Sequence, residues 1–185
     1  MELSKDVLLK EIQDLRDENK RLRKQLEEMN PRDRLTGLLN RGSLYERLEY
    51  EAVRTDRGQS YLSLLLIRIS DFKGLVQEHG KDTMDVLVKL MSQAISESVR
   101  SVDIVGRYED RGFLLLLPDI QPNKGTVVSE RLKKAIDKQI SPMGIRIKYS
   151  IGVKLYRNEP INELLTETER LAMSSEAEGI GRVHM

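Results

Sequence analysis

The chain has no cysteine among its 185 residues. This absence excludes disulfides and thiolate metal sites, and it fits a reducing cytoplasm. The chain also lacks any apolar run near the roughly 20 residues that a helix needs to cross a bilayer. Its N-terminus is charged and polar, unlike a signal peptide. We therefore expect a soluble, cytoplasmic protein.

A charge excess is missing as well. The 31 Lys and Arg residues nearly balance the 30 Asp and Glu residues, which leaves a net charge of +1. This balance gives no reason to expect a nucleic acid or a membrane surface as partner. The two histidines, His79 and His184, have no metal-ligand spacing, so we expect no metal site and no cofactor. A hydrophobic content of 39% suffices for one ordinary core with an appendage.

The first thirty residues have a pattern of their own. Apolar residues and one asparagine are separated by alternating steps of four and three, which is the a/d stripe of a heptad repeat. The positions are Leu8, Ile12, Leu15, Asn19, Leu22, Leu26 and Met29. Leucine at d with a single asparagine at a favours a parallel two-stranded coiled coil in fixed register. The sequence therefore predicts a homodimer through residues 1–30.

Charges beside the stripe support this pairing. Glu11 and Glu18 fall at g positions, and Arg16 and Arg23 fall at e positions. Each glutamate can therefore reach the arginine five residues on in a parallel partner. The alternative is a single amphipathic helix that lies on the globular domain.

Helix and strand signals alternate from Pro31, where proline ends the coil. Ser43 and Glu46 form a capping box that opens a helix to about residue 54. The further elements are expected to be a strand at 61–69, helices from 71 and over 82–99, strands at 103–108 and 113–117 around a turn at 109–112, a helix at 122–140, a strand at 145–155 and a helix at 161–177. This order implies an α+β, ferredoxin-like domain over residues 31–185, with a mainly antiparallel sheet.

Several short segments of this domain resemble the GGDEF family of diguanylate cyclases. They are Asp33 to Arg41 (DRLTGLLNR), Phe72-Lys73, Arg107-Tyr108 with Phe113 to Pro118, Ser150 to Val153, and Gly181-Arg182. Their order and spacing carry the resemblance, which covers about residue 33 to the C-terminus. It implies a palm-like sheet with helices packed on it, in a family that joins two GTP molecules into cyclic di-GMP.

The catalytic positions implied by this resemblance hold unsuitable residue types. In the family, carboxylates from the first strand and from the signature hairpin hold magnesium ions that polarise the phosphates. Here the first-strand position is Arg68. The signature positions read Glu109, Asp110, Arg111, Gly112 and Phe113. An arginine about 4 Å from a divalent ion would repel it by roughly 8 kcal/mol at an effective dielectric of about 20. We therefore expect no catalytic residues and no cyclase activity.

Other nucleotide-binding positions are partly replaced. The replacements are Ser70 for the second aspartate after the first strand, Val76 for a guanine-contacting asparagine and Glu178 for a triphosphate-binding lysine, whereas Lys73, Asp85 and Arg182 are kept. Glu109 and Asp110 could supply carboxylates two places early. That shift would change the direction in which they point on the hairpin.

An RxxD motif precedes the signature hairpin. In the family, such a motif at this offset binds cyclic di-GMP, and here it reads Arg100-Ser101-Val102-Asp103. A guanidinium can fork onto a phosphate or a guanine edge, and a carboxylate can accept from guanine N–H groups. Arg131, on the following helix, matches a position where family members often supply a further arginine. The resemblance thus implies a ligand site made of Arg100, Asp103 and Arg131.

The sequence predicts a catalytically inactive GGDEF protein that acts as a dimeric cyclic di-GMP receptor. Ligand would cross-link two RxxD surfaces, or one such surface and the helix that carries Arg131, and so change which signalling protein the dimer engages. The leading alternative is a ligand-independent dimeric scaffold that keeps the fold only as an interaction surface. An enzyme or a GTP-sensing domain is a third interpretation, which the replaced positions disfavour.

Overall fold

The structure is a computed structural model of the chain, and it describes residues 9–19, 21, 30–58, 60–177 and 183–184. Contacts divide the chain into two units, Met1–Pro31 and Arg32–Met185. In the first unit, residues 9–19 and 21 are helical, and Ile12 and Leu15 are 45% and 55% exposed. The other apolar residues of the predicted stripe lie outside the described residues, so the coiled coil stays a prediction. No described helix is long and apolar enough to cross a membrane.

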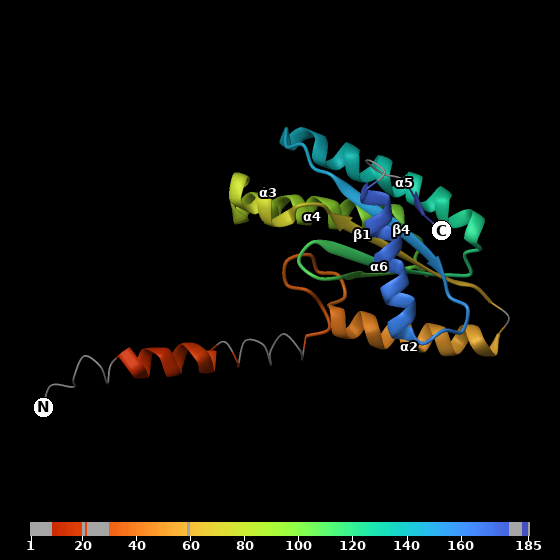
Figure 1. The fold of residues 1–185 in the computed structure, drawn as a ribbon, viewed down its shortest axis with the longest axis horizontal. Helices are drawn as coiled ribbons and strands as arrows, with labels where there is room; N and C mark the ends of the chain where they lie inside the picture. Colours follow the sequence, from red (N-terminus) through yellow and green to blue (C-terminus); the bar gives the residue numbers. More distant parts are fainter. Residues whose placement is uncertain (1–8, 20, 22–29, 59, 178–182, 185) are drawn as a thin grey trace, which may run out of the picture. The chain divides into compact units, whose positions relative to one another are not determined.

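The second unit is built on a five-stranded sheet with the order β2-β3-β1-β4-β5 (Figure 1). The strands are β1 (Leu62–Ile69), β2 (Ile104–Arg107), β3 (Gly112–Pro118), β4 (Tyr149–Leu155) and β5 (Val183–His184). β1 pairs antiparallel with β3 and β4, and β2 pairs antiparallel with β3, whereas β5 runs parallel to β4. The predicted α+β class with a mainly antiparallel sheet is confirmed. The short β5 is a strand that no sequence pattern indicated.

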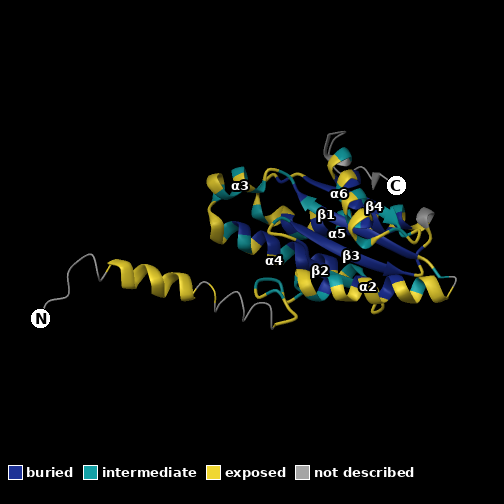
Figure 2. Cartoon of the chain, turned by 60° about the horizontal axis from the view of Figure 1, so that its bottom comes forward, coloured by how far each residue is buried: buried dark blue, intermediate teal, exposed yellow. Residues whose placement is uncertain are grey.

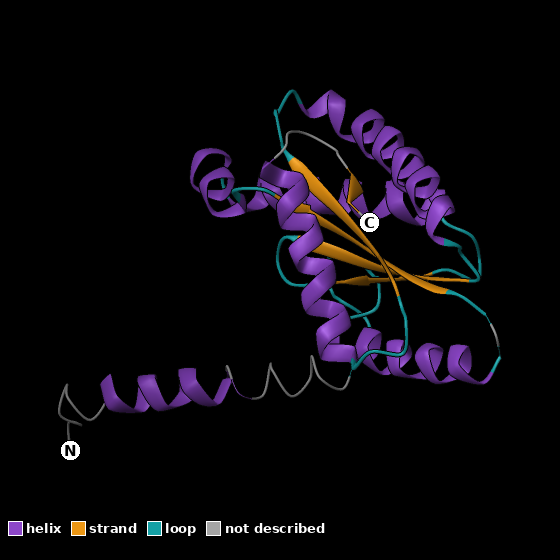
Figure 3. Ribbon diagram, turned by 45° about the vertical axis from the view of Figure 1, so that its right-hand side comes forward, coloured by secondary structure: helices purple, strands orange, loops and turns teal. Residues whose placement is uncertain are grey.

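Helices cover both faces of the sheet (Figure 3). They are α2 (Arg41–Arg57), α3 (Phe72–His79), α4 (Lys81–Ser98), α5 (Pro122–Ile140), a short 3₁₀ helix (Ser141–Met143) and α6 (Ile161–Ala177). One hydrophobic cluster joins α4 and α5 to one face, and a second joins α2 and α6 to the other. The two clusters make a core of helix, sheet and helix layers.

The central strand β1 contributes to both clusters. Leu65 and Ile67 pack with α4 and α5, while Leu64 and Leu66 pack with α2 and α6. All four side chains are at most 2% exposed. Figure 2 shows these buried strands between helices whose outer faces are exposed. Burial on both faces explains why the middle of this strand, Leu64 to Ile67, is a continuous apolar run instead of an alternating one.

The predicted start of α2 is wrong. The helix begins at Arg41, and its N-cap is Asn40, whose side-chain Oδ1 accepts a hydrogen bond from the N–H of Ser43 at 2.8 Å. Ser43 therefore lies in the first turn and does not cap the helix. The helix also continues three residues beyond the predicted end at about residue 54, to Arg57.

The predicted start of the fourth strand is wrong too. β4 begins at Tyr149 and not at residue 145. The 3₁₀ helix Ser141–Met143 ends at Gly144, which adopts a left-handed φ of 68°. The residues after this turn lead the chain back to the sheet. The apolar residues Ile145 and Ile147 therefore lie before the first paired residue of β4.

Candidate functional site

The RxxD motif forms a closed turn between α4 and β2. Arg100 donates to Asp103 Oδ1 from Nη2 at 2.6 Å and from Nε at 3.1 Å. The Arg100 backbone N–H donates to Asp103 Oδ2 at 2.8 Å. In return, the Asp103 N–H donates to the Arg100 carbonyl oxygen at 3.0 Å. The motif therefore has a defined geometry without any ligand.

The two charged side chains of this turn differ sharply in exposure. The Asp103 side chain is 1% exposed and that of Arg100 is 42% exposed. Arg100 Nη2 also donates to the carbonyl oxygen of Pro118 at 2.8 Å. The hydrogen bonds that Arg100 donates to Asp103 raise the pKa of Arg100. Asp103 thus holds the guanidinium by one edge, and the Nη1 group bonds to no described residue.

Two neighbours of Arg100 were missed by sequence reasoning. Pro118 supplies the carbonyl oxygen described above, and the carboxylate of Asp119 adds a smaller electrostatic contribution to the raised pKa of Arg100. Asp119 is exposed and adopts a left-handed φ of 59°. The only available signal was the Pro-Asp pair directly after an apolar strand. Both carboxylates therefore reduce the positive potential that an anion meets at Arg100, although the Asp119 carboxylate itself lies 3.7 Å from Arg54.

Arg131 lies exposed on α5, and no described residue forms an ion pair with it. α5 shares a hydrophobic cluster with α4, the helix that leads into the RxxD turn. The structure thus brings Arg100 and Asp103 into direct contact. It places Arg131 on the neighbouring helix without a bond to either residue.

Arg68 occupies the first-strand position where the resemblance implies a metal-binding aspartate. It lies directly opposite Gly112 in β3 and Ser150 in β4, and such partners share one face of the sheet. Arg68 is half-buried and forms no hydrogen bond or ion pair with a described residue. The hydroxyls of Ser70 and Ser150 are buried without a partner. The positions that face Arg68 across the ladder therefore hold no carboxylate.

The β2–β3 turn leaves no room for a side chain at Gly112. A Cβ there would lie 2.7 Å from the carbonyl oxygen of Tyr108 and 3.1 Å from that of Ile67. The Tyr108 N–H donates to the Gly112 carbonyl at 2.9 Å, which holds this close approach. Glu109 takes the left-handed conformation of the turn, with φ 60°, although a non-glycine residue there costs about 1–2 kcal/mol.

The rest of the turn is held by its backbone. The Arg111 carbonyl accepts from the N–H of Ile69 at 2.7 Å, and the Asp110 carbonyl accepts from the guanidinium of Arg107. Arg107 stacks on the ring of Phe113 at 5.2 Å, and burial lowers its pKa. In the described part of the chain, no three Asp, Glu or His residues are grouped to hold a metal ion. Glu178 and Arg182 lie outside that part.

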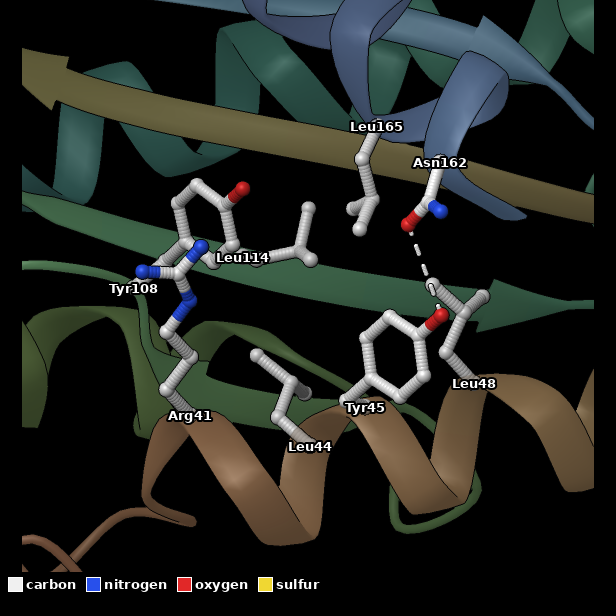
Figure 4. A pocket seen from close by; sticks show the side chains of 8 residues that line it. All are labelled: Arg41, Leu44, Tyr45, Leu48, Tyr108, Leu114, Asn162 and Leu165. Atoms are coloured by element: carbon white, nitrogen blue, oxygen red, sulfur yellow. Dashed lines mark hydrogen bonds between the residues drawn. The ribbon is translucent and has the colours of Figure 1, made fainter.

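A small pocket lies between α2, β3 and α6 (Figure 4). Its volume is about 90 Å³, well below the roughly 300–1,000 Å³ of sites for drug-sized ligands. The lining residues are Arg41, Leu44, Tyr45, Leu48, Tyr108, Leu114, Asn162 and Leu165. No sequence motif indicated this pocket.

The sheet order, the RxxD turn and the signature hairpin define a GGDEF-type domain. Residues 30–182 match the family described as "Diguanylate cyclase, GGDEF domain". The chain belongs to the GGDEF family, and the resemblance found in the sequence is confirmed at this level.

Relatives and solved structures agree with this assignment. Over 139 residues the chain is 30% identical to diguanylate cyclase DosC of Escherichia coli (strain K12). This match covers 73% of the present chain and 30% of DosC. It thus spans less than a third of that relative. Diguanylate cyclase SiaD of Pseudomonas aeruginosa, solved with its activator SiaC, superposes with a TM-score of 0.78 at 24% identity, covering 95% of this chain and 71% of SiaD.

A second solved structure is the GGDEF domain of DgcB from Caulobacter crescentus in complex with c-di-GMP. It superposes with a TM-score of 0.70 at 18% identity, and the match covers 83% of this chain and 94% of the DgcB domain. At these identities the two structural likenesses show that the fold is shared.

Proposed function

We propose that this chain is a catalytically inactive GGDEF protein of the cytoplasm that binds cyclic di-GMP. Arg100 and Arg131 would contact the ligand, Asp103 would hold Arg100 in place, and a dimer would relay the signal to a partner protein. The observation that carries the proposal is the Arg100–Asp103 turn, in which a buried carboxylate fixes a half-exposed guanidinium.

The chemistry of this turn suits a phosphodiester or a guanine edge. Arginine presents five N–H donors in a planar fork, and Asp103 and Pro118 engage only the Nε and Nη2 atoms of Arg100. The remaining edge can donate to a phosphate oxygen or to the acceptor edge of guanine. Because Asp103 orients the fork beforehand, less side-chain entropy is lost when a ligand binds. The buried carboxylate would therefore contribute by position more than by direct contact.

Loss of catalysis is supported by two residues that face each other in the β1–β3 ladder. Arg68 brings a positive charge to the first-strand position, and Gly112 brings no side chain at all. A two-metal or one-metal phosphoryl transfer needs carboxylates at such positions. DosC and SiaD are named as diguanylate cyclases, and this chain would differ from them in this chemistry while it keeps their fold.

Relay through a dimer is supported by the heptad pattern of residues 1–30 and by the exposed apolar side chains of Ile12 and Leu15. The similar protein SiaD was solved in complex with its activator SiaC, so a partner protein is a reasonable expectation for a chain of this fold. We infer that a bound dinucleotide would bring two RxxD turns, or one turn and α5 of the partner, into one site.

Isothermal titration of the full chain with cyclic di-GMP tests the proposal. Saturable heat is expected for the wild type and for Arg146→Ala, which removes an exposed arginine outside the site. Arg100→Ala is expected to lose most of this heat. If the wild type shows no heat and no spectral change, the ligand-independent scaffold becomes the better account.

A further inference from the structure

The pocket between α2, β3 and α6 combines an aliphatic floor with one unpaired cation. Leu44, Leu48 and Leu114 form the floor and are at most 2% exposed, and Leu165 adds a half-buried wall. Figure 4 shows the side chains of Leu44, Leu114 and Leu165 between Arg41 and Tyr108 on one side and Tyr45, Asn162 and Leu48 on the other. The Tyr45 hydroxyl lies 3.5 Å from Asn162 Oδ1, which links the two helices at the rim.

Arg41 stands over the ring of Tyr108, with Cζ 5.2 Å from the ring centroid. The stacking occupies the face of the guanidinium and leaves its N–H edge available, because no described residue forms a hydrogen bond or an ion pair with it. The Tyr108 hydroxyl donates to Glu169 at 2.6 Å. This bond engages the Glu169 carboxylate of α6 with the tyrosine, and no described ion pair joins Glu169 to Arg41.

Arg41 is also the first residue of α2, and the first turn of this helix has no acidic residue. A helix N-terminus carries a partial positive charge, so a cation there is unfavourable and an anion is favourable. The guanidinium and the helix end therefore add to the same positive potential at the mouth of the pocket. An incoming carboxylate would be stabilised by both.

The pocket volume limits what can enter. An engineered apolar cavity of about 150 Å³ holds one benzene molecule, and the present pocket measures about 90 Å³. The space is therefore of a size for one small apolar group, such as a leucine side chain. Residues that contribute most to a protein interface cluster in well-packed, desolvated pockets, and arginine is enriched among them.

We propose that this pocket docks a segment of a partner protein that presents a leucine side chain with an aspartate or glutamate beside it. The leucine side chain fills the space between α2 and α6, and the carboxylate accepts hydrogen bonds from the N–H groups of Arg41. This surface uses none of the residues of the RxxD turn, so we expect it to bind its partner with or without cyclic di-GMP.

The test uses ¹³C-methyl spectra of the leucines of the full chain, titrated with the capped peptide acetyl-Asp-Leu-Asp-amide. The expected result is saturable shifts confined to the methyls of Leu44, Leu48, Leu114 and Leu165. Acetyl-Asn-Leu-Asn-amide should bind about tenfold or more weakly, since a charged hydrogen bond is lost. Acetyl-Asp-Ala-Asp-amide should give no shifts at the four leucines.

Variants separate the two halves of the site. Arg41→Gln should weaken the acidic peptide about tenfold and leave the Asn peptide unchanged. Leu165→Phe should fill the pocket and abolish both. Arg57→Gln, at the exposed end of the same helix, is the matched control and should bind as the wild type. Arg100→Ala should also bind the peptide as the wild type does. Loss of peptide binding would therefore count against the docking pocket, and loss of cyclic di-GMP binding would count against the RxxD site.

Three outcomes would overturn the proposal. Shifts that miss the four leucine methyls would place the peptide elsewhere. Equal binding of the Asp and Asn peptides would remove the role of Arg41. Free 4-methylpentanoate, which carries the same branched group and one carboxylate, should bind more weakly than the acidic peptide. If it binds as tightly, the pocket is a small-molecule site and not a docking site for a protein segment.

Discussion

Arg68 on β1 lies directly opposite Gly112 on β3, so a cation faces a residue without a side chain where the family carries carboxylates. From this pair we predict that GTP is not converted. After incubation with GTP and magnesium or manganese, chromatography should show no cyclic di-GMP above a blank without protein. Turnover that scales with protein concentration would contradict this prediction.

Restoring the acidic residue alone should fail. In Gly112→Glu, the new Cβ would lie 2.7 Å from the Tyr108 carbonyl oxygen, and overpacking of this kind costs about 1–3 kcal/mol. Urea unfolding of Gly112→Glu should therefore show a loss of stability in this range. The double variant Arg68→Asp/Gly112→Glu should still show no cyclase activity. The matched control is Arg111→Glu, one residue earlier in the turn, which should unfold close to the wild type.

The Tyr149–Asp137 pair should make stability depend on alkaline pH. Burial, and then the 2.7 Å hydrogen bond from the Tyr149 hydroxyl to Asp137 Oδ1, raise the pKa of Tyr149 above the ordinary 10.0. The folded state keeps this proton where the unfolded chain loses it. The contribution is therefore complete below pH 10 and declines as the pH rises further.

Tyr149→Phe removes the ionisable group, so its unfolding free energy should fall less steeply above pH 10 than that of the wild type. At pH 7 the variant should lose about 1 kcal/mol, the usual worth of a hydrogen bond. Denaturant unfolding at pH 7, 10 and 11 measures both effects. Tyr61→Phe removes an exposed hydroxyl and is the control. Equal slopes for Tyr149→Phe and the wild type would show that this pair does not carry the effect.

The paired strands could be predicted because a buried strand needs apolar side chains, which form a recognisable run in the sequence. β1 is apolar on both faces and was placed to within one residue. The start of α2 was missed because Asn40 and Ser43 are both good caps, and only the backbone decides which of them closes the first turn. Single-sequence reasoning has no means to make this choice.

In the candidate sites too, features carried by consecutive residues could be predicted, and features that depend on packing could not. Arg100 and Asp103 could be found because four consecutive residues carry the motif. The burial of Asp103 could not, because it depends on how the turn packs beneath its own arginine. The contact of Arg41 with Tyr108 joins residues far apart in the sequence, and no local spacing marks it.

Residues 1–30 should make the chain a parallel dimer in the absence of ligand. The heptad with Asn19 and the Glu11/Arg16 and Glu18/Arg23 pairs motivate this prediction. Light scattering should give twice the chain mass of 21.3 kDa, and a chain that begins at Pro31 should shift toward monomer. Leu22→Cys should cross-link to its own copy under oxidation. A monomeric full chain at micromolar concentration would refute the dimer.

Asp103→Ala should weaken cyclic di-GMP binding by freeing Arg100. The substitution also leaves the exposed Arg100 N–H without its protein acceptor, and the loss of such a hydrogen bond costs about 1 kcal/mol. Thermal unfolding must therefore accompany the titration. Asp103→Asn keeps one oxygen for the Arg100 N–H and should restore part of the stability while affinity stays low. Equal affinity of Asp103→Ala and the wild type would show that the carboxylate does not position Arg100.

Arg100→Ala carries the central claim. A charge-assisted hydrogen bond is worth about 1.5–3 kcal/mol, so its loss should weaken cyclic di-GMP binding about tenfold to a hundredfold. Helix content and melting temperature should stay near those of the wild type, because the Arg100 side chain is 42% exposed.

Arg131→Ala should weaken binding less if Arg131 acts from the neighbouring helix. Arg68→Ala and Arg111→Ala should have little effect, since these residues lie outside the RxxD turn. Calorimetry on this set of variants gives the order of their affinities. If Arg68 or Arg111 proves more important than Arg100, the ligand binds near the β2–β3 turn, and the RxxD turn is not its binding site.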